Sequence, residues 1–300
     1  MLSGVHTPMV TAFNADGALD LDGNERIIAH LVDGGVSGIL LLGSIGEFFA
    51  LSMEEKKRLI RFAADLVGGR TTLLVGTGGT VVDEVIELTQ HAAEVGAGAA
   101  VVVSPYYFLL DEESLYRYYA AVAADSPIPV LLYNFPDRTG VCLSVELIAR
   151  LATDFENIRG LKDTMDSISH TRAVLEAVKP VRPDFAVLSG FDEYLVPNLM
   201  AGGDGLIGGL SNIAPALPVG IHQAYRRGEL AEVQRLQRRV NVLMGLYAVS
   251  QPFVGAIKSA VARVLAGVSP ACRPPAGPLD ERQLAAIDDI LRRAEVPVRD

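Results

Sequence analysis

Short stretches rich in valine, isoleucine and leucine recur along most of the chain without alternating with polar residues. A strand that is buried on both faces has this composition, and such strands are typical of parallel sheets. The pattern predicts strands at residues 4–13, 38–43, 72–78, 99–105, 129–134, 158–163, 185–190 and 205–212.

The segments between these stretches carry apolar residues at the spacing of amphipathic helices. One segment begins with Ser52 and Glu55, the spacing of a capping box, and another ends at Gly96, which can adopt a left-handed turn. Strands that alternate with helices predict an α/β protein, and eight such units predict a closed (β/α)8 TIM barrel. An open doubly wound sheet is the alternative, but no G-x-G-x-x-G turn follows the first predicted strand. The expected helices are residues 52–67, 80–95, 111–124, 144–152, 167–178, 193–201 and 214–227.

The strand pattern stops at about residue 228. Helical spacing then continues over residues 230–248, 253–265 and 280–294. No low-complexity linker separates the two parts, so we expect them to form one folding unit. The sequence therefore predicts a (β/α)8 catalytic domain at residues 1–228 and a C-terminal helical extension at residues 229–300 that packs on the barrel.

The chain of 300 residues has a net charge of −10, which disfavours nucleic acid and anionic membranes as partners. Its apolar runs are too short to span a membrane and its first ten residues lack the pattern of a signal peptide, so we expect a cytoplasmic protein. Cys142 and Cys272 have no pair spacing, and no pattern of His or Cys predicts a metal site or a thiol nucleophile. We expect each of the five histidines, at positions 6, 30, 91, 170 and 222, at the surface or in a helix cap.

Chemistry in a barrel of this kind takes place at the carboxyl ends of the strands. Lys162 ends the sixth predicted strand, where burial disfavours an ammonium and so favours the neutral amine. A neutral amine can attack a carbonyl and form an imine, which accepts electrons when a neighbouring bond breaks. The alternative is a structural lysine that pairs with Asp163 or Asp192 at the rim of the barrel.

Three further groups follow neighbouring strands. Tyr133 ends the fifth strand, where it could transfer protons near Lys162 or could be a rim aromatic with its hydroxyl in water. The small loop at residues 43–46 opens onto a helix, so its backbone N–H groups could hold a carboxylate; otherwise it is an ordinary tight turn. Arg138 could clamp a carboxylate or could lie solvated in its loop.

Three motifs occur together at the ends of the second, fifth and sixth predicted strands: Gly43-Ser44-Ile45-Gly46-Glu47, Tyr133-Asn134-x-Pro136 followed by Thr139-Gly140, and Gly160-Leu161-Lys162-Asp163-Thr164. In this combination, and over essentially its full length, the chain resembles the dihydrodipicolinate synthase / N-acetylneuraminate lyase family of pyruvate-dependent class I aldolases. The resemblance implies that Lys162 forms a Schiff base with pyruvate and that Tyr133 relays protons. It also implies that no cofactor is needed, because the covalent imine on Lys162 does the work of one.

The same resemblance assigns roles to other residues. Ser44 matches a hydroxyl that links the relay tyrosine to a second tyrosine. Tyr107 matches that second tyrosine, which in many members enters from the neighbouring subunit. The backbone of Ser44 and Ile45 would hold the pyruvate carboxylate. Members usually form tetramers built as dimers of dimers, so we expect a homotetramer.

Within the family, the segments at residues 76–80, 133–136, 162–167 and 202–205 are most similar to the branch that cleaves 2-keto-3-deoxy sugar acids such as 2-keto-3-deoxygluconate. Ile45 stands where synthases usually carry threonine, whereas Arg138 matches the synthase arginine that receives the second substrate. Gly209 stands where sialate lyases usually carry serine, which disfavours a sialic acid substrate. The residues that we expect to contact the substrate are Arg138, Thr164, Gly190, Asp192, Glu193 and Ile207. The alternative for Asp192 is that it caps the N-terminus of a helix.

The first hypothesis is a lyase that cleaves a 2-keto-3-deoxy sugar acid to pyruvate and an aldehyde. The same chemistry would allow a synthase that condenses pyruvate with aspartate semialdehyde, or a dehydratase of a sugar acid. From other classes, the glycines at residues 202–209 leave a phosphosugar isomerase open, because many barrels bind phosphate near these strands. A barrel that binds a ligand without catalysis is the last alternative.

Overall fold

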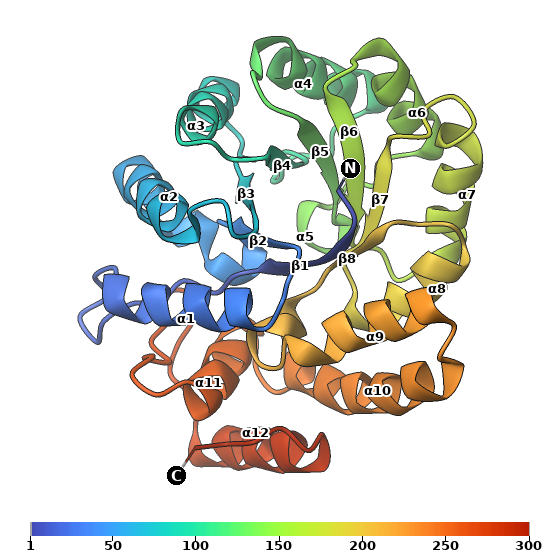
Figure 1. Ribbon diagram of the computed structural model, residues 1–300. Helices are drawn as coiled ribbons and strands as arrows, with labels where there is room; N and C mark the ends of the chain where they lie inside the picture. The colour runs from blue at the N-terminus through green and yellow to red at the C-terminus, as the bar shows by residue number, and fades with distance from the viewer. Residues whose placement is uncertain (1, 300) are drawn as a thin grey trace. The chain divides into compact units, whose positions relative to one another are not determined.

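The computed structural model describes residues 2–299 of the chain. Within them, eight parallel strands are hydrogen-bonded in chain order and close into a barrel, which confirms the predicted fold (Figure 1). Every strand lies inside a stretch that the apolar pattern predicts. The strands are β1 (Gly4–Pro8), β2 (Gly38–Leu41), β3 (Thr72–Gly76), β4 (Ala99–Val103), β5 (Val130–Asn134), β6 (Ile158–Asp163), β7 (Ala186–Ser189) and β8 (Gly205–Ile207).

The helices also match the predicted segments, with two additions, α1 and the short α5. Helix α1 begins with Gly23 and Asn24 in its first turn, and these weak helix formers hide the helical signal. Its N-cap is Asp20, whose side chain accepts from the Gly23 backbone. The helices are α1 (Leu21–Asp33), α2 (Met53–Val67), α3 (Val82–Glu94), α4 (Glu112–Asp125), α5 (Pro136–Thr139), α6 (Val145–Asp154), α7 (Ile168–Val178), α8 (Leu195–Met200), α9 (Ala216–Arg227), α10 (Leu230–Leu243), α11 (Val254–Val264) and α12 (Glu281–Arg293).

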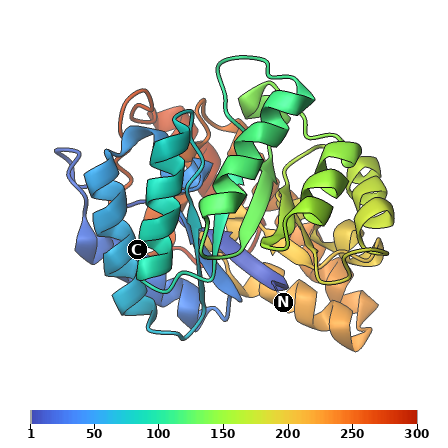
Figure 2. The ribbon, with the colours of Figure 1, turned by 90° about the horizontal axis from the view of Figure 1, so that it is seen from above.

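One compact unit comprises residues 2–4 and 72–207. Helices α4, α6 and α7 pack over β4 to β7, and the apolar side chains between them form one continuous core that includes the fully buried Tyr119 and Phe185 (Figure 1). The chain between β4 and α4 forms a loop that rises at the top of Figure 2. Gly96 ends the segment of α3 with a φ of 82°, the left-handed turn that the sequence predicts.

The other compact unit comprises residues 5–71 and 208–299. It holds β1 and β2, which pair in register from His6 with Gly38 to Pro8 with Leu40. Helices α9 and α10 lie side by side, as do α11 and α12 (Figure 1). The predicted capping box of α2 is confirmed, because the Glu55 backbone donates to the Ser52 hydroxyl and the Ser52 backbone donates to the Glu55 carboxylate.

Three predicted boundaries differ most from the structure. The strand expected at residues 4–13 ends at Pro8. The stretch at residues 205–212 ends as a strand at Ile207, and Gly209–Asn212 forms a 3-10 turn in which the side chains of Ser211 and Asn212 bond to backbone carbonyls. The helix expected at residues 230–248 ends at Leu243 and continues as the 3-10 turn Met244–Ala248. The division between barrel and extension at residue 228 stays a prediction. Among residues 2–299, every helix is too short or too polar to cross a membrane.

Candidate active site

The carboxyl ends of β5 and β6 bring the two predicted catalytic side chains together. The strand register pairs Tyr133 with Lys162, and paired residues of neighbouring parallel strands project from the same face of a sheet. The Lys162 Nζ lies 4.1 Å from the centroid of the Tyr133 ring, and the two residues are only 3% and 5% exposed. The Phe135 ring stacks on Tyr133 at 5.7 Å between centroids. The predicted proximity of Lys162 and Tyr133 is therefore confirmed, whereas their catalytic roles stay a prediction.

The alternative reading of Lys162 as an ion-paired lysine is wrong for the described residues. Within residues 2–299, no carboxylate oxygen lies within the 4.0 Å of an ion pair from its Nζ. The carboxylate of Asp163 is bound by other groups, described below. Lys258 shows the contrast, since it is equally buried but donates to the Glu47 carboxylate at 2.7 Å. Lys162 and Lys258, the two lysines buried among residues 2–299, both lie over an aromatic ring, and Lys162 alone of the two has no carboxylate within ion-pair distance.

The residues that follow the pair along each strand form a buried polar cluster. Asn134 donates to Asp163 at 2.9 Å, and Thr171 on α7 donates to the other carboxylate oxygen at 2.9 Å. The His170 Nδ1 lies 2.9 Å from that same oxygen. Burial lowers the pKa of His170, but hydrogen bonds to Asp163 and Cys142 outweigh it and raise the pKa to about 10.

The expectation that all five histidines lie at the surface or in caps is wrong. His6 and His91 are buried at 1% and 5% exposure, and His170 belongs to the polar cluster. The physical reason for His91 and His170 is that an imidazole with a partner is tolerated in a protein interior, and they pair with Glu94 and Asp163. His30 lies in the last turn of α1, where it is half-buried, and Gly34 is the C-cap of that helix.

Ser44 and Ile45 lie in a 3-10 turn that directly follows β2. The turn is fixed at both sides, because the Gly46 N–H donates to the Gly43 carbonyl at 3.0 Å and the Thr11 hydroxyl donates to the Gly46 carbonyl at 2.7 Å. A short, rigid turn of this kind presents backbone N–H groups in a fixed direction.

Glu47 ends this turn in the left-handed region, with a φ of 55°. Its side chain is fully buried, and both carboxylate oxygens have donors. One accepts from the Lys258 Nζ at 2.7 Å and the other from the Arg273 backbone N–H at 2.9 Å. The C-terminal segment of the chain therefore anchors the turn that carries Ser44 and Ile45.

Ile45 and Gly209 pack against one another. A Cβ on Gly209 would lie 2.7 Å from the Ile45 Cδ1 and 2.5 Å from the Tyr247 hydroxyl. Real Cβ atoms do not approach so closely, so a side chain at residue 209 would displace one of these groups. The two departures from family patterns, at Ile45 and at Gly209, are thus one packing feature.

The chain that follows β6 lies against the chain that follows β7. A Cβ on Gly190 would lie 1.8 Å from the Thr164 Oγ1, so this approach requires glycine. The Thr164 hydroxyl is buried and, among the described residues, has no hydrogen-bond partner. Asp192 is 3% exposed and is the first residue of a 3-10 turn whose cap is Phe191, so the alternative of a capping role is wrong.

Acidic groups lie close together at this end of β6 and β7. Burial raises the pKa of the Glu193 carboxyl, and the negative charge of Asp166 raises it further. The Tyr194 hydroxyl donates to Asp166, and this hydrogen bond raises the pKa of Tyr194 to about 12. Carboxylates arranged in this way can accept hydrogen bonds from substrate hydroxyls.

The remaining predicted site residues differ in exposure. Ile207 is buried at the end of β8. Arg138 is exposed on α5, and its guanidinium lies 5.5 Å from the Phe135 ring, beside the ring that stacks on Tyr133. Tyr107 is 90% exposed and has a φ of 94°, which turns its ring outward onto Phe108.

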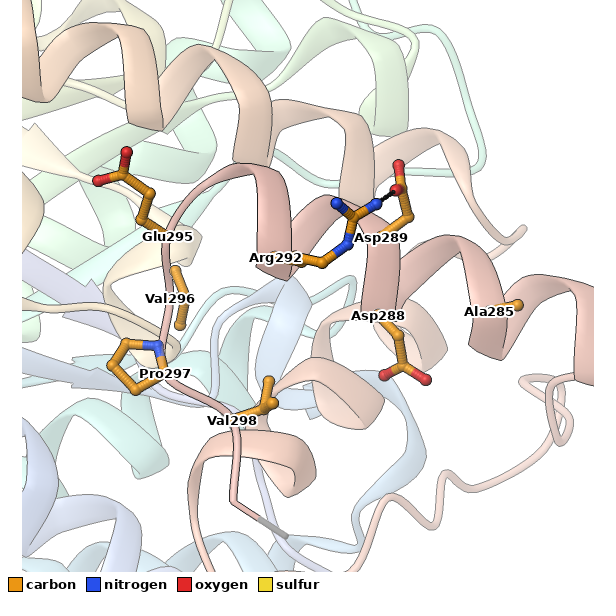
Figure 3. Close-up of a pocket in the computed structure, with 8 residues that line it drawn as sticks. All are labelled: Ala285, Asp288, Asp289, Arg292, Glu295, Val296, Pro297 and Val298. Atoms are coloured by element: carbon orange, nitrogen blue, oxygen red, sulfur yellow. Dashed lines mark hydrogen bonds and ion pairs between the residues drawn. The ribbon is translucent and has the colours of Figure 1, made fainter.

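Two surface cavities are lined by other residues. One, of about 680 Å³, lies along α12 and the C-terminal chain, where Figure 3 shows Arg292 bonded to Asp289 and Glu295 pointing away from both. The other, of about 410 Å³, lies between the start of α3 and the loop before α4 and is lined by Tyr106, Phe108 and Tyr118. Neither holds Lys162 or Tyr133. Among residues 2–299, no three His, Cys, Asp or Glu side chains are grouped to hold a metal ion.

Sequence analysis missed the roles of His170, Thr171 and Lys258. Only Lys258 carried a signal, since it is a lone charge in the otherwise apolar first turns of α11. His170 and Thr171 gave none, because their partner Asp163 lies on another element and nothing local indicates the contact.

Comparison with known proteins agrees with this geometry. The model of the dihydrodipicolinate synthetase family matches residues 1–294. Escherichia coli strain K12 has two similar proteins. YagE, provisionally named a 2-dehydro-3-deoxy-D-gluconate aldolase, is 41% identical over 99% of this chain and 98% of its own length. YjhH, provisionally named a 2-dehydro-3-deoxy-D-pentonate aldolase, is 40% identical over 91% of each chain.

Solved structures of members of this family have closely similar folds. The crystal structure of YagE in complex with pyruvate has a TM-score of 0.97 and covers 99% of this chain and 100% of its own. Dihydrodipicolinate synthase from Aquifex aeolicus has a TM-score of 0.94 at 27% identity, with both chains fully covered.

Proposed function

The chain belongs to the dihydrodipicolinate synthetase family of class I aldolases and lyases, and from this premise we propose that it cleaves a 2-keto-3-deoxy sugar acid to pyruvate and an aldehyde. The observation that carries the proposal is the buried Lys162 amine, which lies over the Tyr133 ring and has no carboxylate partner within residues 2–299. The names of the two Escherichia coli relatives support the choice of substrate class.

In the proposed reaction the Lys162 Nζ attacks the C2 carbonyl of the sugar acid. Tyr133 gives its proton to the hydroxyl of the carbinolamine, so that water leaves, the protonated imine forms and Tyr133 remains as the phenolate. Tyr133 takes the proton from the C4 hydroxyl, the C3–C4 bond breaks, and the aldehyde departs. The electron pair of that bond enters the iminium and gives an enamine. Tyr133 returns its proton to C3, and water hydrolyses the imine to release pyruvate and the free lysine.

The remaining assignments follow the family resemblance. Ser44 and Tyr107 extend the proton relay, with Tyr107 reaching the site of a neighbouring subunit in a homotetramer. The backbone of Ser44 and Ile45 holds the pyruvate carboxylate. The aldehyde portion is selected by Arg138, Thr164, Gly190, Asp192, Glu193 and Ile207. No cofactor is required, and the protein acts in the cytoplasm.

A second candidate is the synthase reaction, in which the enamine of pyruvate condenses with aspartate semialdehyde. The observation that favours it is the exposed Arg138 beside Phe135, since an arginine there can bind a second carboxylate.

The first experiment traps the imine. The protein is incubated with pyruvate, reduced with borohydride and weighed intact by mass spectrometry. We expect the mass gain of one reduced pyruvyl adduct in wild type and in Lys179→Ala, and no gain in Lys162→Ala. Absence of the adduct in wild type would remove the central claim and leave the isomerase and the binding barrel to be tested with phosphate ligands.

The second experiment identifies the reaction. Pyruvate release from 2-dehydro-3-deoxy-D-gluconate and the corresponding pentonate is compared with condensation of pyruvate and aspartate semialdehyde. We expect kcat/KM for cleavage to exceed that for condensation by at least about 100-fold, or about 2.7 kcal/mol. The reverse ratio would support the synthase instead, and a product that keeps all its carbon atoms would indicate a dehydratase.

A further inference from the structure

A closed ring of hydrogen bonds lies one residue beyond the Lys162–Tyr133 pair. The register that pairs Tyr133 with Lys162 also pairs Asn134 with Asp163. Successive side chains of a strand project from opposite faces, so Asn134 and Asp163 lie on the face turned away from the lysine and tyrosine. The Asn134 Nδ2 donates to Asp163 at 2.9 Å and thereby ties the two strands at the level of the reactive pair.

The ring closes through the chain that joins α5 to α6. The Leu143 N–H donates to the Asn134 Oδ1 at 3.0 Å, and the Leu143 carbonyl accepts from the His170 Nε2 at 3.0 Å. The His170 Nδ1 completes the ring at Asp163, 2.9 Å away. Both polar groups of the Leu143 backbone are therefore used, and three elements, β5, β6 and α7, meet in one network.

A protonated His170 and an ionised Asp163 fit the hydrogen bonds of this ring. A doubly protonated imidazole donates from both nitrogens, as the contacts to Asp163 and Leu143 require. Burial opposes this charge, but the hydrogen bonds to Asp163 and Cys142 hold the pKa of His170 at about 10. The Asp163 side chain has no exposure, and its two oxygens accept from Asn134, Thr171 and His170. A buried network with every member bonded is rigid, because any displacement breaks a strong bond in a medium of low dielectric.

We propose that Asp163, His170 and Asn134 are positioning residues for the imine chemistry, holding Lys162 and Tyr133 in register through the strand residues that follow them. This inference rests on the proposed function, since it assigns the ring to the step in which Lys162 attacks the carbonyl. A misplacement of about 1 Å at a reacting group slows a reaction by about 100-fold, so a network that fixes both strands at this level affects the rate directly.

The alternative is that the ring only stabilises the fold. The two roles differ in what they predict for a folded variant. A stabilising ring changes the melting temperature and leaves the rate constants unchanged. A positioning ring changes the rate constant of imine formation and kcat, and leaves the KM for the sugar acid nearly unchanged, because none of the three side chains is assigned to substrate binding.

The test uses His170→Ala, Asn134→Ala and the milder His170→Asn, which keeps a donor toward Asp163. The control is Arg172→Gln, on the same helix, whose side chain makes an exposed ion pair with Glu176. Imine formation with pyruvate is followed by rapid mixing, borohydride quench and mass spectrometry. Circular dichroism and thermal melting establish that each variant is folded at the assay temperature.

We expect His170→Ala and Asn134→Ala to slow imine formation and kcat by at least about tenfold with less than a threefold change in KM. His170→Asn should recover part of the rate, and Arg172→Gln should match wild type. Folded variants with rate constants within twofold of wild type and lowered melting temperatures would overturn the proposal. If the alanine variants do not fold, His170→Asn tests the proposal, and an unchanged rate constant of imine formation in this variant overturns it. Failure of the proposed function itself is seen separately, as the absence of any adduct in wild type.

Discussion

Lys162 and Lys258 are equally buried, and the difference between them lies in their neighbours. A buried lysine that pairs with a carboxylate serves the structure, as Lys258 does with Glu47. Lys162 is not held by an ion pair within residues 2–299, so its amine can serve as the nucleophile of the proposed reaction. Burial alone therefore does not separate the proposed catalytic lysine from the structural one, but burial together with the carboxylate partner does.

The contact between Ile45 and Gly209 can be tested by substituting these two residues singly and together. Gly209→Ala should lower the free energy of unfolding by about 1–3 kcal/mol, because the new Cβ meets the Ile45 Cδ1 and the Tyr247 hydroxyl. Ile45→Val removes Cδ1, so the double variant should be more stable than the sum of the single changes by about 0.5 kcal/mol or more. Urea unfolding of the four proteins measures this coupling. Strict additivity would show that the two side chains do not interact.

His170 gives a pH dependence whose sign follows from its environment. Its pKa in the folded protein, about 10, lies above the ordinary value of 6.5. The stabilisation it contributes is therefore complete below about pH 6.5 and is lost as the pH rises through about 10. We expect the melting temperature of wild type to fall more than that of His170→Asn between about pH 7 and about pH 11, measured by calorimetry. Parallel curves would contradict the charged state of His170.

At the scale of elements, the turn after β2 is held by α11 and the chain beyond it. Lys258→Met should lower the free energy of unfolding by about 3–5 kcal/mol, because it leaves the Glu47 carboxylate buried without its counter-charge. Lys258→Met combined with Glu47→Met should be less harmful than Lys258→Met alone. Arg227→Gln, which breaks an exposed pair with Glu229, is the control and should change stability by less than about 1 kcal/mol. Denaturant titration measures the free energy of unfolding of these variants. An equal effect of Lys258→Met and Arg227→Gln would refute the claim that Lys258 holds the turn through Glu47.

The elements themselves could be predicted because their signal is local. The uniformly apolar strands identify a parallel sheet, and Ser52 with Glu55 marks the start of α2. Lys162 and Tyr133 could be found because polar residues that end apolar strands are few. The ring through Asp163, His170 and Leu143 could not, since each bond joins residues at least seven positions apart on different elements. The end of β8 was missed for a related reason, because Asn212 bonds backward to the Pro8 carbonyl on β1.

At the scale of the whole molecule, the loop between β4 and α4 carries three consecutive large apolar residues that are exposed. Tyr107, Phe108 and Leu109 are 90%, 71% and 80% exposed. A run of apolar residues of this size on a surface is typical of a contact with another protein, and the proposed tetramer supplies one.

The corresponding test is the mass in solution. Wild type should have about four times the mass of its 32.0 kDa chain in light scattering coupled to size exclusion. Phe108→Ser with Leu109→Ser should shift the distribution toward smaller species and lower kcat, because Tyr107 then no longer reaches a neighbouring site. Phe49→Ser, another exposed aromatic on a different loop, serves as the comparison. A wild-type protein of monomer mass with full activity would contradict both the tetramer and the role of Tyr107.

The packing of Ile45 on Gly209 also constrains how such a protein can change during evolution. A lineage that carries a larger residue at position 209 loses about 1–3 kcal/mol of stability if isoleucine arises at position 45 first, since the Ile45 Cδ1 must then move aside. The less costly order is for glycine to arise before isoleucine and for isoleucine to be lost before glycine is replaced. One contact therefore favours one order of substitutions, and reconstructed ancestors that hold isoleucine beside a larger residue should be less stable than their neighbours in the series.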